Sequence, residues 1–192
     1  MTKSTLSTWI IYAFFLFVPV ASSAQEVIHA LAGVVISINQ KAKTIFLSTD
    51  DESDGNFKDL VASKTPLKFD KKLTADAIAA DAFTEVGAHV VVLYYGYHEM
   101  RTVIALRNMG SGPLTWTDGK VLKYEGKSHT LTIQDTTSNV VSFKVTESTV
   151  AETPVGAAKG FKFQIDKGNH VRVTAANVNG DSTALFINVN VM

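Results

Sequence analysis

The sequence of 192 residues contains no cysteine. This absence excludes a disulfide framework, a thiolate nucleophile, a cysteine-ligated zinc site and an iron–sulfur cluster. It also excludes a lipid anchor attached to a cysteine. The fold must therefore be stabilised by its packed apolar side chains alone.

An excess of charge of either sign is also missing. The 18 lysine and arginine residues balance 18 aspartate and glutamate residues, and charged residues make up 19% of the chain. A neutral chain presents no electrostatic footprint for nucleic acid or for an anionic membrane surface. Nucleic acid is therefore the least favoured class of partner.

A hydrophobic run long enough to cross a membrane is absent as well. The unbroken apolar segment 9–18 has about half of the roughly 20 residues that a bilayer requires. Lys3 precedes it, and the small residues Ser22, Ser23 and Ala24 follow it. The pattern predicts a signal peptide over residues 1–24, cleaved after Ala24, with no membrane anchor left after cleavage. We therefore expect a periplasmic or secreted protein.

The common catalytic motifs are absent too. The chain has no G-x-S-x-G, no H-E-x-x-H and no glycine-rich phosphate loop. No catalytic residue, metal ligand or cofactor is predicted on this basis.

What the chain does contain is a pattern that occurs twice. Residues near the start of each copy match at an offset of 86, and residues near the end match at an offset of 81. Matches in one order, with one change of length between them, favour duplication of a single unit. The clearest pairs are Gly33 with Gly119, Val35 with Val121, Thr44 with Thr130, Leu47 with Ile133, and the segment 87–92 with 168–173.

Each copy has the period of β-strands. In segments 44–48 and 130–134 the apolar residues lie two apart, and the longer first strands are expected at 28–38 and 117–124. Three strands, a connection and a two-strand hairpin follow one another in each copy. This is the element order of the OB-fold, a five-stranded Greek-key barrel.

One segment departs from the β pattern. Residues 74–83 are rich in alanine, with Thr74 placed to cap a helix and with Ile78 and Ala82 on one face. The predicted fold class is therefore all-β with a short helix, built as two tandem small OB-like barrels. We expect the barrels at residues 25–110 and 117–192, joined by a linker at 111–116.

These strand motifs resemble the exported OB-like repeat domains of unknown function found in bacteria. The resemblance rests on segments 33–35 and 44–47, on Phe57, and on Gly87 before Val90-x-Val92, each with a counterpart in the second copy. It implies the barrel fold and brings no established activity.

The first copy is also similar to periplasmic copper-binding OB-fold chaperones. That family holds Cu(I) with a histidine just after the second strand, together with a tryptophan and paired methionines. Leu47 and Ser48 stand in the histidine region here, and the methionines after the signal peptide, Met100, Met109 and Met192, are far apart. The ligands of the copper site are therefore missing from this sequence.

The candidate ligand residues are Tyr95, Tyr97 and His98, at the tip of the last hairpin of the first copy. OB-folds often bind oligosaccharides, oligonucleotides or peptides with this loop. The alternative is that Tyr94 completes the core and its neighbours pack against the second barrel.

Three other features have mainly structural interpretations. His89 and His170 occupy the same position in the two copies and are expected to face solvent. The segment 50–55 partly follows the spacing of a calcium loop, and is expected to be a solvated acidic turn. Trp116 is expected to lie wedged between the two barrels.

These observations favour a non-catalytic exported protein that binds or scaffolds in the cell envelope. Its partner would be an envelope protein, a peptide or an oligosaccharide. The alternative is a periplasmic metal-binding protein, and an enzyme of another kind ranks third.

Overall fold

The computed structural model describes residues 27–49, 55–58, 73, 76–96, 101–110 and 112–189, with residues 55–58 described by their backbone. Two β-sheets account for most of this part of the chain, and its helical residues form only 3-10 turns, so the prediction of an all-β protein is confirmed. We call residues 27–110 the first half and residues 112–189 the second half. The predicted signal peptide lies outside the described residues. No helix in the described part of the chain is long and apolar enough to cross a membrane.

The first half forms a six-stranded sheet with the order β3-β2-β1-β5-β6-β4. Its core contains the side chains that alternate along β1, β2 and β5, together with Phe83. β6 also lies close to β3, although the two strands are near opposite ends of this order. The strands are β1 (His29–Asn39), β2 (Thr44–Thr49), β3 (Gly55–Lys58), β4 (Ile78–Ala79), β5 (His89–Tyr95) and β6 (Thr102–Asn108).

The second half forms a seven-stranded sheet with the order β11-β10-β13-β12-β7-β8-β9. A parallel pairing of Thr183 with Lys144 joins β13 to β9, and this pairing closes β7, β8, β9, β13 and β12 into a ring. The strands are β7 (Leu114–Glu125), β8 (Thr130–Asp135), β9 (Val140–Lys144), β10 (Val150–Thr153), β11 (Gly156–Lys159), β12 (His170–Val178) and β13 (Asp181–Val189).

The two sheets share local features at the offsets found in the sequence. Gly33 pairs with Thr49, and Gly119 pairs with Asp135, each 86 residues further on. A β-bulge follows at the second residue after each glycine. The first strand of each half also donates an equivalent hydrogen bond. The Val35 N–H donates to the Ala88 carbonyl at 3.0 Å, and the Val121 N–H donates to the Asn169 carbonyl at 2.9 Å.

The helix predicted at 74–83 is wrong over its described residues. Ile78 and Ala79 form β4 by pairing with Leu106 and Ala105 of β6, and a single 3-10 turn, η1 (Ala80–Ala82), follows. The turn buries Ala80 and Phe83 in the core of the first half. Hydrogen bonds to a sheet edge and burial of Phe83 outweigh the helix propensity of alanine, which is a weak preference. The second half has the 3-10 turn η3 (Gly160–Lys162) at the corresponding place.

The linker is shorter than predicted. β7 begins at Leu114 rather than at residue 117, because residues 114–116 continue the ladder with β12. Trp116 is therefore a strand residue.

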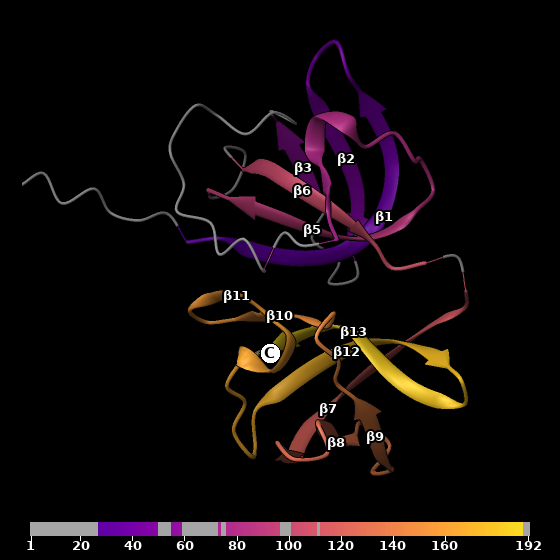
Figure 1. The fold of residues 1–192 in the computed structure, drawn as a ribbon, viewed down its shortest axis with the longest axis vertical. Coiled ribbons are helices and arrows are strands. Elements are labelled where there is room, and N and C mark those ends of the chain that lie inside the picture. Colours follow the sequence, from indigo (N-terminus) through magenta and orange to yellow (C-terminus); the bar gives the residue numbers. More distant parts are fainter. Residues whose placement is uncertain are drawn as a thin grey trace, which may run out of the picture.

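The two halves meet along an apolar seam, in which β1 lies over β10, β11 and β13 (Figure 1). The Ala157 N–H also donates a hydrogen bond of 2.7 Å to the Ile28 carbonyl across it. β5 is consequently buried on both faces: Val90 and Val92 face the core of the first half, and Val91 and Leu93 face the seam. The buried seam residues are Ala30, Ala32, Leu73, Val91, Leu93 and Ala105 from the first half, and Val150 and Phe186 from the second.

Candidate functional site

The outer surface of the second sheet carries a set of polar side chains and one exposed tryptophan. Successive side chains of a strand point to opposite faces, so Trp116, Asp118 and Lys120 share the outer face of β7. In the register with β12, Thr174 faces Trp116, Arg172 faces Asp118 and His170 faces Lys120. We call the six residues Trp116, Asp118, Lys120, Gln134, His170 and Arg172 the polar face; Gln134 belongs to it because it faces Lys120 from β8.

An ion pair holds the centre of the polar face in a defined geometry. Arg172 donates from Nε to Asp118 Oδ1 at 2.7 Å and from Nη2 to Asp118 Oδ2 at 3.1 Å. Such a fork fixes both side chains in one plane and is more specific than a contact between point charges. The positive charge of Arg172 is thereby balanced by Asp118.

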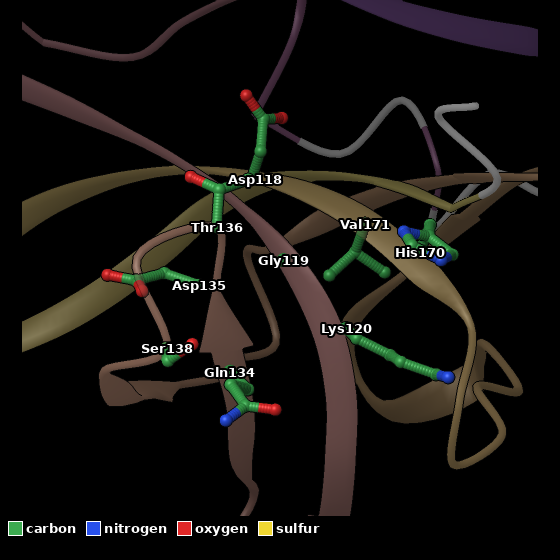
Figure 2. A pocket seen from close by; sticks show the side chains of 9 residues that line it. All are labelled: Asp118, Gly119, Lys120, Gln134, Asp135, Thr136, Ser138, His170 and Val171. Atoms are coloured by element: carbon green, nitrogen blue, oxygen red, sulfur yellow. The ribbon is translucent and has the colours of Figure 1, made fainter.

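A hollow of about 360 Å³ lies beside this pair. Figure 2 shows Gly119 on β7 between the turn with Asp135 and Ser138 on one side and His170 on the other. A side chain cannot replace the hydrogen of Gly119, because a Cβ there would collide with the Gln134 carbonyl oxygen. The close approach of β7 to β8 thus requires glycine at the point where the hollow opens.

The second carboxylate of the hollow is used by its own turn. Asp135 Oδ1 accepts hydrogen bonds from the Thr137 N–H at 2.9 Å, the Thr137 hydroxyl at 2.8 Å and the Asn139 N–H at 2.8 Å. Burial acts to raise the pKa of Asp135, but these hydrogen bonds outweigh it and lower the pKa. Asp135 is a structural anion that shapes the turn.

Three other polar side chains that line the hollow are not used in this way. Within the described residues, Lys120, Gln134 and His170 are exposed and make no side-chain hydrogen bond or ion pair. The hollow is therefore lined by an ammonium group, an imidazole and an amide that can bind an external group.

Trp116 borders the polar face on the side of the seam. Its side chain is 47% exposed, and its ring centroid lies 6.1 Å from that of His89 in the first half. Thr174, its neighbour across the ladder, is fully covered. Trp116 thus contacts the first half through His89, as expected for a residue between the halves, but it is also partly exposed.

The corresponding face of the first half is apolar. The positions equivalent to Trp116 and Asp118 are Ala30 and Ala32, and the position equivalent to Arg172 is Val91, which is buried in the seam. The positions that bind the other half in the first sheet are therefore polar and at least partly exposed in the second.

The sequence-predicted ligand residues lie elsewhere. Tyr95 is at the end of β5 with only 7% of its surface exposed, which leaves little of its ring for stacking on a ligand. Tyr97 and His98 lie outside the described residues, and their role stays a prediction. Tyr94 packs against the core of the first half.

Of the paired histidines, His170 is exposed as predicted, whereas His89 is partly covered beside Trp116. Residues 50–54 of the acidic segment lie outside the described residues. In the part of the chain that the structure describes, no three histidine, aspartate or glutamate side chains gather closely enough to hold a metal ion.

No protein-family model matches the chain, and no curated protein matches its sequence.

Proposed function

We propose that the protein is a non-catalytic binding module, exported to the bacterial cell envelope, whose ligand site is the polar face of the second half. One observation carries this proposal: an exposed indole lies on the same strand face as a rigidly held carboxylate–guanidinium pair, beside a hollow whose lining residues are mostly polar. Binding sites commonly combine an apolar surface with a few well-oriented polar groups.

The proposal includes the architecture that presents this face. Two OB-like barrels derived from one duplicated unit are supported by the matching glycine positions and bulges of the two halves, and by the ring of strands in the second. In this scheme the first barrel serves as a scaffold, because its equivalent surface is occupied by the seam.

A thermal-shift screen tests the binding function. A panel of oligosaccharides, peptides and oligonucleotides is added to the wild type and to a Trp116→Ala/His170→Ala variant. A ligand that binds only the native state stabilises it by about 2.7 kcal/mol when its concentration is a hundred times its Kd. This stabilisation raises the melting temperature. We expect at least one class to stabilise the wild type and not the variant, while a Phe46→Ala control, altered at an exposed apolar side chain of the first half, behaves as the wild type.

Two results would contradict the proposal. Ligands that act equally on the wild type and on the double variant would show that the polar face is not the site. Turnover of a substrate from a broad hydrolase panel would show that the protein is an enzyme. The N-terminal sequence of protein recovered from the periplasm tests export, and we expect it to begin at Gln25.

A further inference from the structure

The polar face is elongated along β7. Trp116 and Lys120 lie four residues apart on one strand, a distance of roughly 13 Å at the rise of a β-strand. The Asp118–Arg172 pair lies between them, and His170 and Gln134 lie on either side of Lys120. A ligand that uses both ends must therefore be elongated, and a short chain of linked units has this shape.

The indole at one end selects for a flat ligand with an apolar surface and polar edges. The face of an aromatic ring attracts C–H groups, which carry a small positive charge, and Trp combines a large apolar area with little conformational freedom. A pyranose ring has this character, since its C–H bonds form an apolar face and its hydroxyl groups surround it.

The centre of the face matches those hydroxyl groups. The two oxygens of Asp118 keep further lone pairs when they bind Arg172, so each can accept a hydrogen bond from a hydroxyl. The imidazole of His170 and the amide of Gln134 each offer a donor and an acceptor. Asp118 and Arg172 already hold each other in place, so these two side chains lose little conformational entropy when a ligand binds.

Charge then distinguishes between classes of saccharide. Asp118 is balanced by Arg172, whereas Asp135 keeps its negative charge and is held by hydrogen bonds on its own turn, on the opposite side of Gly119 from His170 (Figure 2). Lys120 is the charged residue of the face that has no counter-ion among the described residues. Its ammonium group suits a carboxylate, which it binds by a charge-assisted hydrogen bond.

We propose that the polar face binds an acidic oligosaccharide, with a sugar ring stacked on Trp116 and a sugar carboxylate bound by Lys120. This inference rests on the proposed function, because it names the ligand class of the same site. A polynucleotide suits the face less well, since it requires a continuous basic groove and a series of stacking rings.

The test uses two probes with the same sugar chain, an oligogalacturonide and its methyl ester, in which a small methyl group replaces the negative charge of each carboxylate. Of the two tryptophans, Trp9 lies in the predicted signal peptide, so the protein that begins at Gln25 has Trp116 as its single indole, and the fluorescence of this indole reports binding. We expect the acid to bind at least tenfold more tightly than the ester. In Lys120→Gln this preference falls to within twofold, whereas in Lys127→Gln, which removes an exposed charge from the neighbouring turn, it is kept.

A second measurement tests the stacking on Trp116. Isothermal titration calorimetry is expected to show a loss of affinity for the acid of at least tenfold in Trp116→Ala and a smaller loss in Trp116→Phe, which keeps an aromatic surface. Circular dichroism confirms that each variant is folded. Equal losses in the two variants would overturn the stacking role.

The possible failures can be told apart. If neither probe binds, or if acid and ester bind equally, the acidic oligosaccharide is excluded. The proposed function survives that result if the binding of a peptide, an oligonucleotide or a neutral oligosaccharide from the screen still depends on Trp116 and His170. If no class depends on these residues, the proposed function fails as well.

Discussion

Glu152 accepts a hydrogen bond from His29 Nδ1 at 2.7 Å, and so joins two residues that lie 123 positions apart in the sequence. Its other carboxylate oxygen accepts the N–H of Ala30 at 2.6 Å. Glu152 stands on β10 and the other two residues on β1, so a single carboxylate fastens the first strand of one half to the sheet of the other.

This contact is continuous with the polar face. Across the ladder Glu152 faces Asn188, Asn188 faces Arg172, and Arg172 faces Asp118. One row of polar residues thus runs from the seam to the candidate ligand site. Its inner end fixes the two halves together, and its outer end is open to solvent.

Removing the Glu152 carboxylate is expected to weaken the fold. Glu152→Ala leaves the Ala30 N–H and the His29 Nδ1 donor without their acceptor, and burial of such groups costs about 1–3 kcal/mol. Glu152→Gln should cost less, because an amide can still accept one hydrogen bond at this place. Urea unfolding measures both values, with the exposed Glu147→Ala as a control that changes little. Equal losses in Glu152→Ala and Glu147→Ala would contradict the role of the contact.

The same carboxylate predicts a dependence of stability on pH. Burial raises the pKa of Glu152, and the hydrogen bonds from His29 and Ala30 offset this only in part. From the ordinary value of 4.5 up to the raised pKa, the folded state therefore holds more protons than the unfolded state. The contribution of Glu152 to the free energy of unfolding must fall as the pH rises through this window. Urea unfolding over a pH series should show this fall in the wild type relative to Glu152→Gln, and a difference that rises with pH would contradict it.

The strands could be predicted from the sequence because their signals are local. The alternation in 44–48 and 130–134, and the offsets that relate Gly33 to Gly119, depend on neighbouring residues and on one self-comparison. The unbroken run Val90–Leu93 also carried a readable signal, since continuous apolar strands are typical of burial on both faces. The helix predicted for the alanine-rich segment 74–83 was wrong because the pairing of this segment with β6 is a tertiary interaction, which local sequence does not reveal.

The candidate site could not be predicted in the same way. Its residues come from β7, β8 and β12, and only the registers of three strands bring Lys120, Gln134 and His170 together. The alternation of Trp116, Asp118 and Lys120 was visible in the sequence. Its meaning depended on knowing that residues 114–116 belong to the strand rather than to a linker.

The two glycines of the first strands give a matched pair of predictions. In Gly33→Ala the new Cβ would lie 2.5 Å from the Ser48 carbonyl oxygen, and Gly119→Ala meets the Gln134 carbonyl oxygen in the same way. A backbone atom cannot move aside cheaply, so we expect each variant to lose about 1–3 kcal/mol in urea unfolding. Gly126→Ala is the control, because a Cβ there has no neighbour within 4 Å. A loss in Gly126→Ala as large as in the other two would contradict a steric cause.

Substitution of Phe186 tests the contribution of the seam to stability separately from that of the core of the second half. This side chain is 4% exposed and packs among seam residues, whereas Leu131 and Ile133 of β8 belong to the core inside the second half. Removing a buried phenylalanine side chain costs about 3–5 kcal/mol, so Phe186→Ala should be strongly destabilising, while Val155→Ala, at an 86% exposed position, should not.

Hydrogen exchange shows where that stability is lost. In Phe186→Ala the amides of β1 and β5 should exchange faster, because they lose the packing that the seam provides, while the amides of β8 keep most of their protection. An equal rise of exchange in β8 would mean that the two halves unfold as one unit. In that case the seam would be part of a single core, and the first half could not act as a separate scaffold for the polar face.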